Sequence, residues 1–159
     1  MSVSGYLDRD GVAYLAGRID GWLAEIAEVS TSIAAIDRGT SDDTASGDPR
    51  WYVRMRGEAK EFTTVWLTLG QRTLRYETYV MPAPEENAEM LYENLLRRNE
   101  RLVGAHFSIG IEDAVFLRGE LLVDDVDAEQ LDRVLGTLFA AVEESFGTLI
   151  RIGFASRFA

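Results

Sequence analysis

The chain holds one histidine, His106, and so one side chain whose ordinary pKa suits acid–base catalysis near neutral pH. A Ser-His-Asp arrangement needs a nucleophile beside the imidazole and a carboxylate behind it. Ser108 follows by two residues, about 7 Å along a strand. We therefore interpret His106 as a structural or solvated histidine. The alternative is a small-ligand-binding domain or enzyme that uses His106 with nearby carboxylates.

Metal and phosphate sites have recognisable patterns that this sequence lacks. The acidic run 124–129 offers oxygen ligands, but it has neither the central glycine nor the twelfth-position glutamate of an EF-hand loop. There is no cysteine, so disulfides and thiolate ligands are excluded. The glycines form no Gly-x-Gly-x-x-Gly, and Gly70-Gln71-Arg72 lacks the ending of a P-loop. The sequence predicts no cofactor, no metal and no enzyme.

Charge narrows the class of partner. The net charge is −11, whereas a nucleic-acid-binding protein normally shows a basic footprint. Ten acidic residues and only two arginines lie between Glu112 and Glu144. We interpret this stretch as a solvated acidic helix face, with electrostatic steering of a basic partner as the alternative. We expect no nucleic-acid partner.

The amino-acid sequence shows no recognisable secretory signal and no membrane-spanning segment. The first residues show no basic region followed by an apolar run, as a secretory signal would. No stretch approaches the roughly 20 apolar residues of a membrane span. The absence of cysteine suits a reducing compartment. We expect a cytoplasmic protein with no membrane partner.

Apolar periodicity in the first half predicts a helix followed by strands. Residues 8–28 carry a helical apolar stripe, with Asp8 as N-cap. Residues 29–37 fit either an extension of that helix or a short strand, and the polar segment 38–50 predicts a flexible surface loop. Aromatic and β-branched residues joined by short turns then predict three antiparallel strands, at 51–57, 62–69 and 73–81.

The second half predicts a helix, a hairpin and a last helix. Acidic residues begin and arginines end the helix expected at 85–102, which complements its dipole. Strands at 103–111 and 114–123 form the hairpin. The last helix is expected at 128–146. Asp127 is its N-cap, with Gln130 at capping-box spacing, and Gly147 is its C-cap. The tail 148–159 is apolar enough that we expect it to dock on the domain or on a partner.

These elements predict one α+β domain, 1–159, with the order helix, three strands, helix, two strands, helix and with helices packed mainly on one face of an antiparallel sheet. Side chains alternate between the two faces of a strand. One alternating set is mostly aliphatic and should meet the helices. The other set is rich in arginine and aromatic residues, which are common at protein interfaces. It is either a solvated face or a partner-binding surface, and its candidate contact residues are Tyr52, Arg54, Arg56, Phe62, Trp66, Arg75, Tyr79, Phe116 and Arg118.

From Phe62 to about Glu144, several short motifs occur in a fixed order. They are Tyr79-Val-Met-Pro82 running into Glu85-Glu-Asn87, Leu91-Tyr-Glu-Asn-Leu-Leu-Arg-Arg-Asn99, Ala105-His-Phe107-Ser-Ile109, and the acidic entry to the last helix at 124–127. In these motifs the chain resembles the YbjN-type family of bacterial sensory transduction regulators. That family in turn resembles type III secretion chaperones in fold.

The resemblance implies a binding function. Chaperone-like domains of this kind usually form homodimers and hold polypeptide segments, and they have no catalytic residues to carry over to this chain. We therefore expect a non-enzymatic, chaperone-like or regulatory module that acts as a homodimer and binds a protein or peptide partner. A structural subunit of a larger complex is a further alternative.

Overall fold

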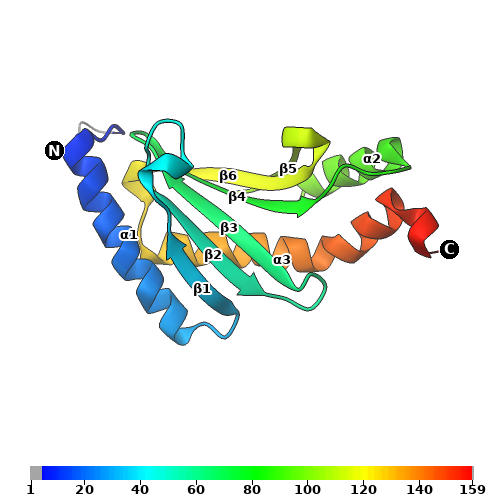
Figure 1. The fold of residues 1–159 in the computed structure, drawn as a ribbon, viewed down its shortest axis with the longest axis horizontal. Coiled ribbons are helices and arrows are strands. Elements are labelled where there is room, and N and C mark those ends of the chain that lie inside the picture. The colour runs from blue at the N-terminus through cyan, green and yellow to red at the C-terminus, as the bar shows by residue number, and fades with distance from the viewer. Residues whose placement is uncertain (1–4, 159) are drawn as a thin grey trace.

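The computed structural model describes residues 5–158, and within them it confirms an α+β fold with three helices and one six-stranded antiparallel sheet (Figure 1). The strand order is β1-β2-β3-β4-β6-β5. The bounds are α1 Arg9–Val29, β1 Ile33–Arg38, β2 Arg50–Arg56, β3 Phe62–Leu69, β4 Thr73–Met81, α2 Ala88–Asn99, β5 His106–Ile109, β6 Val115–Leu122 and α3 Ala128–Gly153. Short 3-10 helices lie at Ser41–Asp43, Ile111–Asp113, Val123–Asp125 and Ala155–Phe158.

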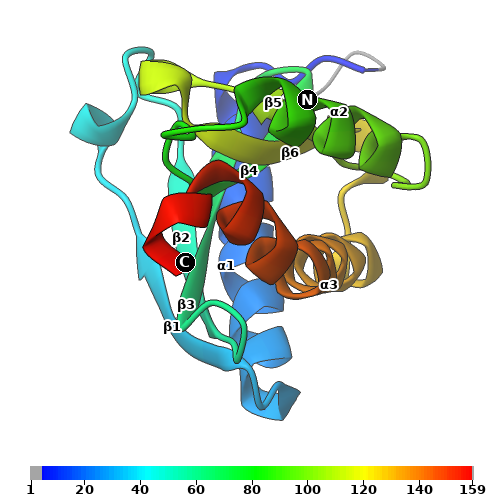
Figure 2. The ribbon, with the colours of Figure 1, turned by 90° about the vertical axis from the view of Figure 1, so that its right-hand side faces the viewer.

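Helices α1 and α3 cover the same face of the sheet, and α2 lies beside β5 (Figure 2). The core between them contains the aliphatic side chains that alternation predicts, such as Val53, Leu67 and Leu117, which are fully buried. Alternation along the predicted strand 103–111 also places Val103 and Ile109 in this aliphatic set, and both placements are wrong. Val103 is 85% exposed because it lies before β5 begins, and Ile109 at the end of this edge strand is 50% exposed.

The starts of the two long helices are capped as predicted. Asp8 accepts a hydrogen bond from the Gly11 N–H at 2.7 Å, and Asp127 accepts one from the Gln130 N–H at 2.8 Å. Each carboxylate satisfies a backbone donor that has no partner within its own helix. Within residues 5–158, no helix is long and apolar enough to cross a membrane.

The segment after α1 is a strand, so four strands and not three precede α2. β1 pairs antiparallel with β2 and forms one edge of the sheet. Arg38 belongs to β1 and Arg50 to β2, which shortens the predicted loop to residues 39–49. This connection contains a 3-10 turn, and the Tyr52 hydroxyl donates to the Asp43 carboxylate at 2.9 Å.

The predicted end of the last helix at Gly147 is wrong. α3 continues to Gly153, because the apolar stripe continues through the buried Leu149 and packing outweighs the helix cost of one glycine. Much of the predicted tail is therefore helical. Its remainder contacts the segment before α2, where Arg157 forms an ion pair with Glu85 at 2.7 Å and the Ser156 N–H donates to Glu86 at 2.6 Å.

Two other elements are shorter than predicted. α2 begins at Ala88 because Asn87, its N-cap, has a left-handed backbone conformation with a φ of 55°. β5 has only four residues, and Gly104, with a φ of 78°, turns the chain just before it.

Candidate functional site

The face of the sheet opposite α1 and α3 is here named the open face. Antiparallel pairing brings alternate residues of the six strands into transverse rows, of which the longest runs Asp37, Tyr52, Trp66, Glu77, Arg118 and His106. All nine predicted contact residues lie on this face. They are Tyr52, Arg54, Arg56, Phe62, Trp66, Arg75, Tyr79, Phe116 and Arg118.

Trp66 is the centre of the aromatic part of the open face. Tyr52 on β2 contacts its ring edge-on, with centroids 6.2 Å apart and an interplanar angle of 81°. The Arg50 guanidinium lies 5.5 Å from the Trp66 centroid, and its Nε donates to the Thr68 hydroxyl at 2.9 Å. The sequence reasoning missed Arg50 because it was assigned to the loop. Counting back two residues from Tyr52 would have placed it on this face.

Phe62 is sandwiched by arginines at the end of the β2–β3 hairpin. The Arg54 guanidinium lies 3.7 Å from the ring centroid and that of Arg56 lies 5.5 Å from it. Both arginines are exposed, and within the described residues neither forms an ion pair. Such contacts contribute about 0.5–1 kcal/mol each at exposed sites. The stacking orients two guanidiniums whose hydrogen-bond donors face water.

Phe116 is buried, which corrects the expectation that it lies exposed among the other aromatic residues. Only 3% of it is exposed, because Tyr79 packs edge-on at 5.6 Å and the Arg118 guanidinium lies 4.4 Å above the ring. Gly110 also approaches it so closely that a Cβ there would lie 2.5 Å from a ring carbon. A partner could not reach Phe116 without moving these neighbours.

Arg118 and Arg75 differ in their availability. Arg118 is held by Glu77 at 3.3 Å and by the Ser108 hydroxyl at 3.2 Å, so it links three strands. Arg75 is exposed, and its strand neighbours are Thr68 and Glu120. The accessible arginines of the open face therefore gather on β2 and β4.

A protein-family model matches most of this chain. The family model YbjN, described as "Putative bacterial sensory transduction regulator", matches residues 25–151. The chain belongs to the YbjN family. The match is longer than the stretch that carries the motifs, and it runs from the end of α1 through most of α3. It therefore includes the whole open face.

Mycobacterial proteins are similar to this YbjN-family chain. An uncharacterized protein of Mycobacterium tuberculosis is 36% identical over 108 residues, which are 68% of this chain and 59% of that protein. The Mycobacterium bovis protein gives the same values, and that of Mycobacterium leprae is 36% identical over 107 residues, 67% of this chain and 58% of its own length. The chain thus spans about three fifths of the curated relatives that it matches.

His106 of the YbjN-family chain is exposed on the edge strand β5, opposite Arg118. It borders an open hollow of about 570 Å³ that Arg75, Glu77 and Glu120 also line. Ser108 is engaged by Arg118, and within residues 5–158 His106 makes no hydrogen bond with a serine or a carboxylate. Nothing in this geometry points to enzyme activity. No group of three histidine or acidic side chains in that range is arranged to hold a metal ion.

Lys60 lies beside the open face, at the turn between β2 and β3. Its ammonium group donates to the carbonyl oxygens of Tyr79 at 2.6 Å and Val80 at 3.1 Å. β4 has a bulge here, so these carbonyls lie where the regular ladder is interrupted. Burial lowers the pKa of Lys60 to about 8. Burial also raises the pKa of the Tyr79 phenol, and the negative charge of Glu112 raises it further by a smaller amount.

Proposed function

We propose that this YbjN-family protein is a non-enzymatic regulator that binds a polypeptide partner on the open face. The observation that supports this most is the pair of guanidiniums of Arg54 and Arg56 over Phe62, which form no ion pair with any residue from 5 to 158 and lie next to Trp66 and Tyr52. Tryptophan, tyrosine and arginine are the residue types that contribute most at protein interfaces. Their aromatic rings are already ordered, so binding would cost little side-chain entropy.

The charge of the open face favours an acidic partner segment. Its strand positions carry five arginines, Arg50, Arg54, Arg56, Arg75 and Arg118, and three carboxylates, Asp37, Glu77 and Glu120. The chain as a whole has a net charge of −11. A basic surface on an acidic protein would attract a partner's carboxylates here and repel them elsewhere.

The proposal includes a homodimer in the cytoplasm. The dimer follows from the expectation, made from the sequence motifs alone, of a type III secretion chaperone-like fold, and the compartment from the absence of cysteine. Light scattering coupled to size exclusion tests the dimer on the full chain. A monomer that persists at high protein concentration would remove this part of the proposal and leave the binding surface to be tested separately.

Binding is tested by capture of partners from the native cell, with mass spectrometry, using wild type, two test variants and one control variant. Arg54→Ala and Trp66→Ala should each weaken capture of the same partner, while Arg133→Ala, an exposed arginine of α3, should not. Loss of the Arg54–Phe62 contact should cost at most about 1 kcal/mol, so Arg54→Ala should stay folded and melt only slightly below wild type. Equal capture by all three variants would argue against the open face as the partner site.

Phe116→Ala separates the buried from the accessible part of this face. Because Phe116 is 3% exposed, its truncation should cost about 3–5 kcal/mol of stability. An Arg54→Ala variant that lost comparable stability would show that the arginine also belongs to the core.

A further inference from the structure

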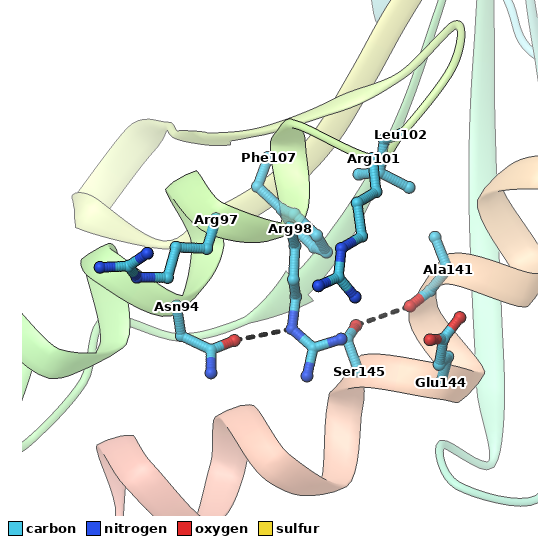
Figure 3. Close-up of a pocket in the computed structure, with 9 residues that line it drawn as sticks. All are labelled: Asn94, Arg97, Arg98, Arg101, Leu102, Phe107, Ala141, Glu144 and Ser145. Carbon is cyan, nitrogen blue, oxygen red and sulfur yellow. Dashed lines mark hydrogen bonds between the residues drawn. The ribbon is translucent and has the colours of Figure 1, made fainter.

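A second recess lies away from the open face, between α2, β5 and α3. It has a volume of about 450 Å³ and is lined by Asn94, Arg97, Arg98, Arg101, Leu102, Phe107, Ala141, Glu144 and Ser145 (Figure 3). Residues of α2 and of the turn after it form one side of this space, and residues of α3 form the other. We name it the arginine pocket.

Two guanidiniums point into the arginine pocket. In Figure 3, Arg98 from the last turn of α2 and the exposed Arg101 from the turn after α2 extend toward α3, whereas Arg97 points to one side. Arg97 forms an exposed ion pair with Glu93 at 3.5 Å, so its charge is partly balanced. Within the described residues Arg98 and Arg101 form no ion pair, even though Glu144 lies on the same wall.

Arg98 is oriented before any ligand arrives. Its Nε donates to the Asn94 side-chain oxygen at 2.6 Å, and the residue is half-buried. That bond leaves the amide N–H groups of Asn94 as further donors beside the guanidinium. An arginine fixed in this way loses less conformational entropy on binding than a solvated one.

The dipole of α2 explains why arginines are found at its C-terminal end, but it does not explain the pocket. A dipole interaction needs neither a fixed guanidinium nor a facing wall of side chains. Here the wall is completed by buried Phe107 and by Ser145, whose hydroxyl donates to the Ala141 carbonyl at 2.6 Å and keeps its lone pairs as acceptors. The recess has the volume of a small-molecule site, typically about 300–1,000 Å³.

The donors and acceptors define the ligand class. Two guanidinium forks with an amide suit an anion with several oxygens, above all a phosphate. Glu144 only accepts, so it disfavours a bare anion but can accept from a hydroxyl group. We propose that the arginine pocket binds a small phosphorylated molecule that carries hydroxyl groups, with Arg98 and Arg101 on the phosphate and Glu144 on a hydroxyl.

Titration calorimetry of the full chain with ribose 5-phosphate, AMP, adenosine, inorganic phosphate and citrate tests the proposal. At least one of the two phosphorylated sugar probes should bind saturably, and at least tenfold more tightly than adenosine. Arg98→Ala and Arg101→Ala should each weaken that binding about tenfold or more, as expected for a lost charge-assisted hydrogen bond. Arg98→Lys, which keeps the charge and loses the fork, should also weaken it.

Matched controls separate this site from folding and from the open face. Arg133→Ala removes an arginine from an exposed helical ion pair, with Glu129 at 3.6 Å, that resembles Arg97 with Glu93. It and Arg54→Ala on the open face should bind the probe as wild type does, and melting curves should show every variant folded. Glu144→Gln should reduce the preference for ribose 5-phosphate over inorganic phosphate.

Three results would overturn the proposal. The first is no saturable binding of either phosphorylated sugar probe at millimolar concentration. The second is binding that Arg98→Ala and Arg101→Ala leave unchanged, because the probe would then occupy another site. The third is tighter binding of citrate, or of inorganic phosphate, than of both phosphorylated sugars, which would assign the pocket to carboxylates or bare anions. None of these results bears on partner capture by the open face.

Discussion

The carboxylate of Glu143 accepts the backbone N–H of Lys60 at 3.1 Å, which ties α3 to the turn between β2 and β3. The same carboxylate accepts the N–H groups of Glu58 at 2.6 Å and Ala59 at 3.1 Å. One side chain of α3 thus satisfies three successive donors of a turn that is 83 or more residues away in sequence. It holds the hairpin that presents Arg56 and Phe62.

Glu143→Gln should make the free energy of unfolding less dependent on pH in the acidic range. Burial raises the pKa of Glu143, but the three backbone hydrogen bonds together outweigh it and hold that pKa below its ordinary value of 4.5. A lowered pKa in the folded state means that the stabilisation is complete above pH 4.5 and is lost as the pH falls through the folded value. Glu143→Gln should therefore lose about 1 kcal/mol near pH 7 and less at pH 3.

Chemical denaturation at a series of pH values measures this. Glu144→Gln, at the next residue of α3, is the matched control, because Glu144 is exposed and accepts no hydrogen bond from a described residue. If Glu143→Gln and Glu144→Gln follow the same pH profile, the turn contact contributes nothing.

Lys60 should titrate near pH 8. Its folded pKa of about 8 lies below the ordinary 10.5, so between these values the unfolded chain binds more protons and the free energy of unfolding rises with pH. The rise should be present in wild type and absent from Lys60→Met. Because Lys60 is the only lysine, a single ¹³C-labelled side-chain signal in NMR reports the midpoint directly. A midpoint above 10 would contradict the prediction.

Thr63→Val should stabilise the protein by about 1 kcal/mol. Thr63 on β3 is fully buried, and its hydroxyl has no hydrogen-bond partner within the described residues. Such a group costs about 1–3 kcal/mol of desolvation, and valine has nearly the same shape. Thr78→Val is the matched control and should destabilise, because the buried Thr78 hydroxyl donates to the Thr64 carbonyl at 2.8 Å. Equal effects in calorimetric melting would refute this distinction.

Gly119→Ala should destabilise β6 by about 1–3 kcal/mol. A Cβ at this position would lie 2.5 Å from the Tyr76 ring and would also collide with the Gly104 carbonyl, which accepts the Tyr76 hydroxyl. The backbone can yield only by opening the turn before β5. Gly136→Ala in α3 is the opposite case, since a Cβ there meets nothing within 4 Å and alanine favours a helix by up to about 1 kcal/mol. Thermal melts of the two variants should shift in opposite directions.

Local sequence signals predicted the parts of this fold that depend on neighbours along the chain. Strands β3 and β4 have the predicted bounds, because aromatic and β-branched residues alternate there between clear turns. Asp8 and Asp127 were predictable as the starts of α1 and α3 because an N-cap is a contact between residues only three positions apart.

Elements that depend on distant contacts were harder to predict. β1 contains two alanines and no buried residue, so its own sequence pattern does not distinguish a strand from a helix. Its hydrogen-bonded pairing with β2 makes it a strand. Gly147 is a common helix end, yet packing of Leu149 carries α3 past it.

In the candidate sites, too, features set by local sequence were predictable and features set by distant contacts were not. Alternation correctly placed the nine predicted residues on one face, but it could not show that Tyr79, Arg118 and Gly110 bury Phe116. The arginines near the end of α2 were interpreted as complements of the helix dipole. Only the packing of α3 against α2 brings Glu144 and Ser145 beside them and forms a pocket.

The three tryptophans lie in environments that intrinsic fluorescence can separate. Trp51 is 1% exposed and donates its indole N–H to Asp20 at 2.7 Å, so its emission reports unfolding. Trp22 lies half-buried on α1 beneath Arg18. Trp66 alone lies on the open face, half-covered by Tyr52 and Arg50. The difference between the spectra of wild type and Trp66→Phe therefore isolates an optical signal from that surface, without any attached dye.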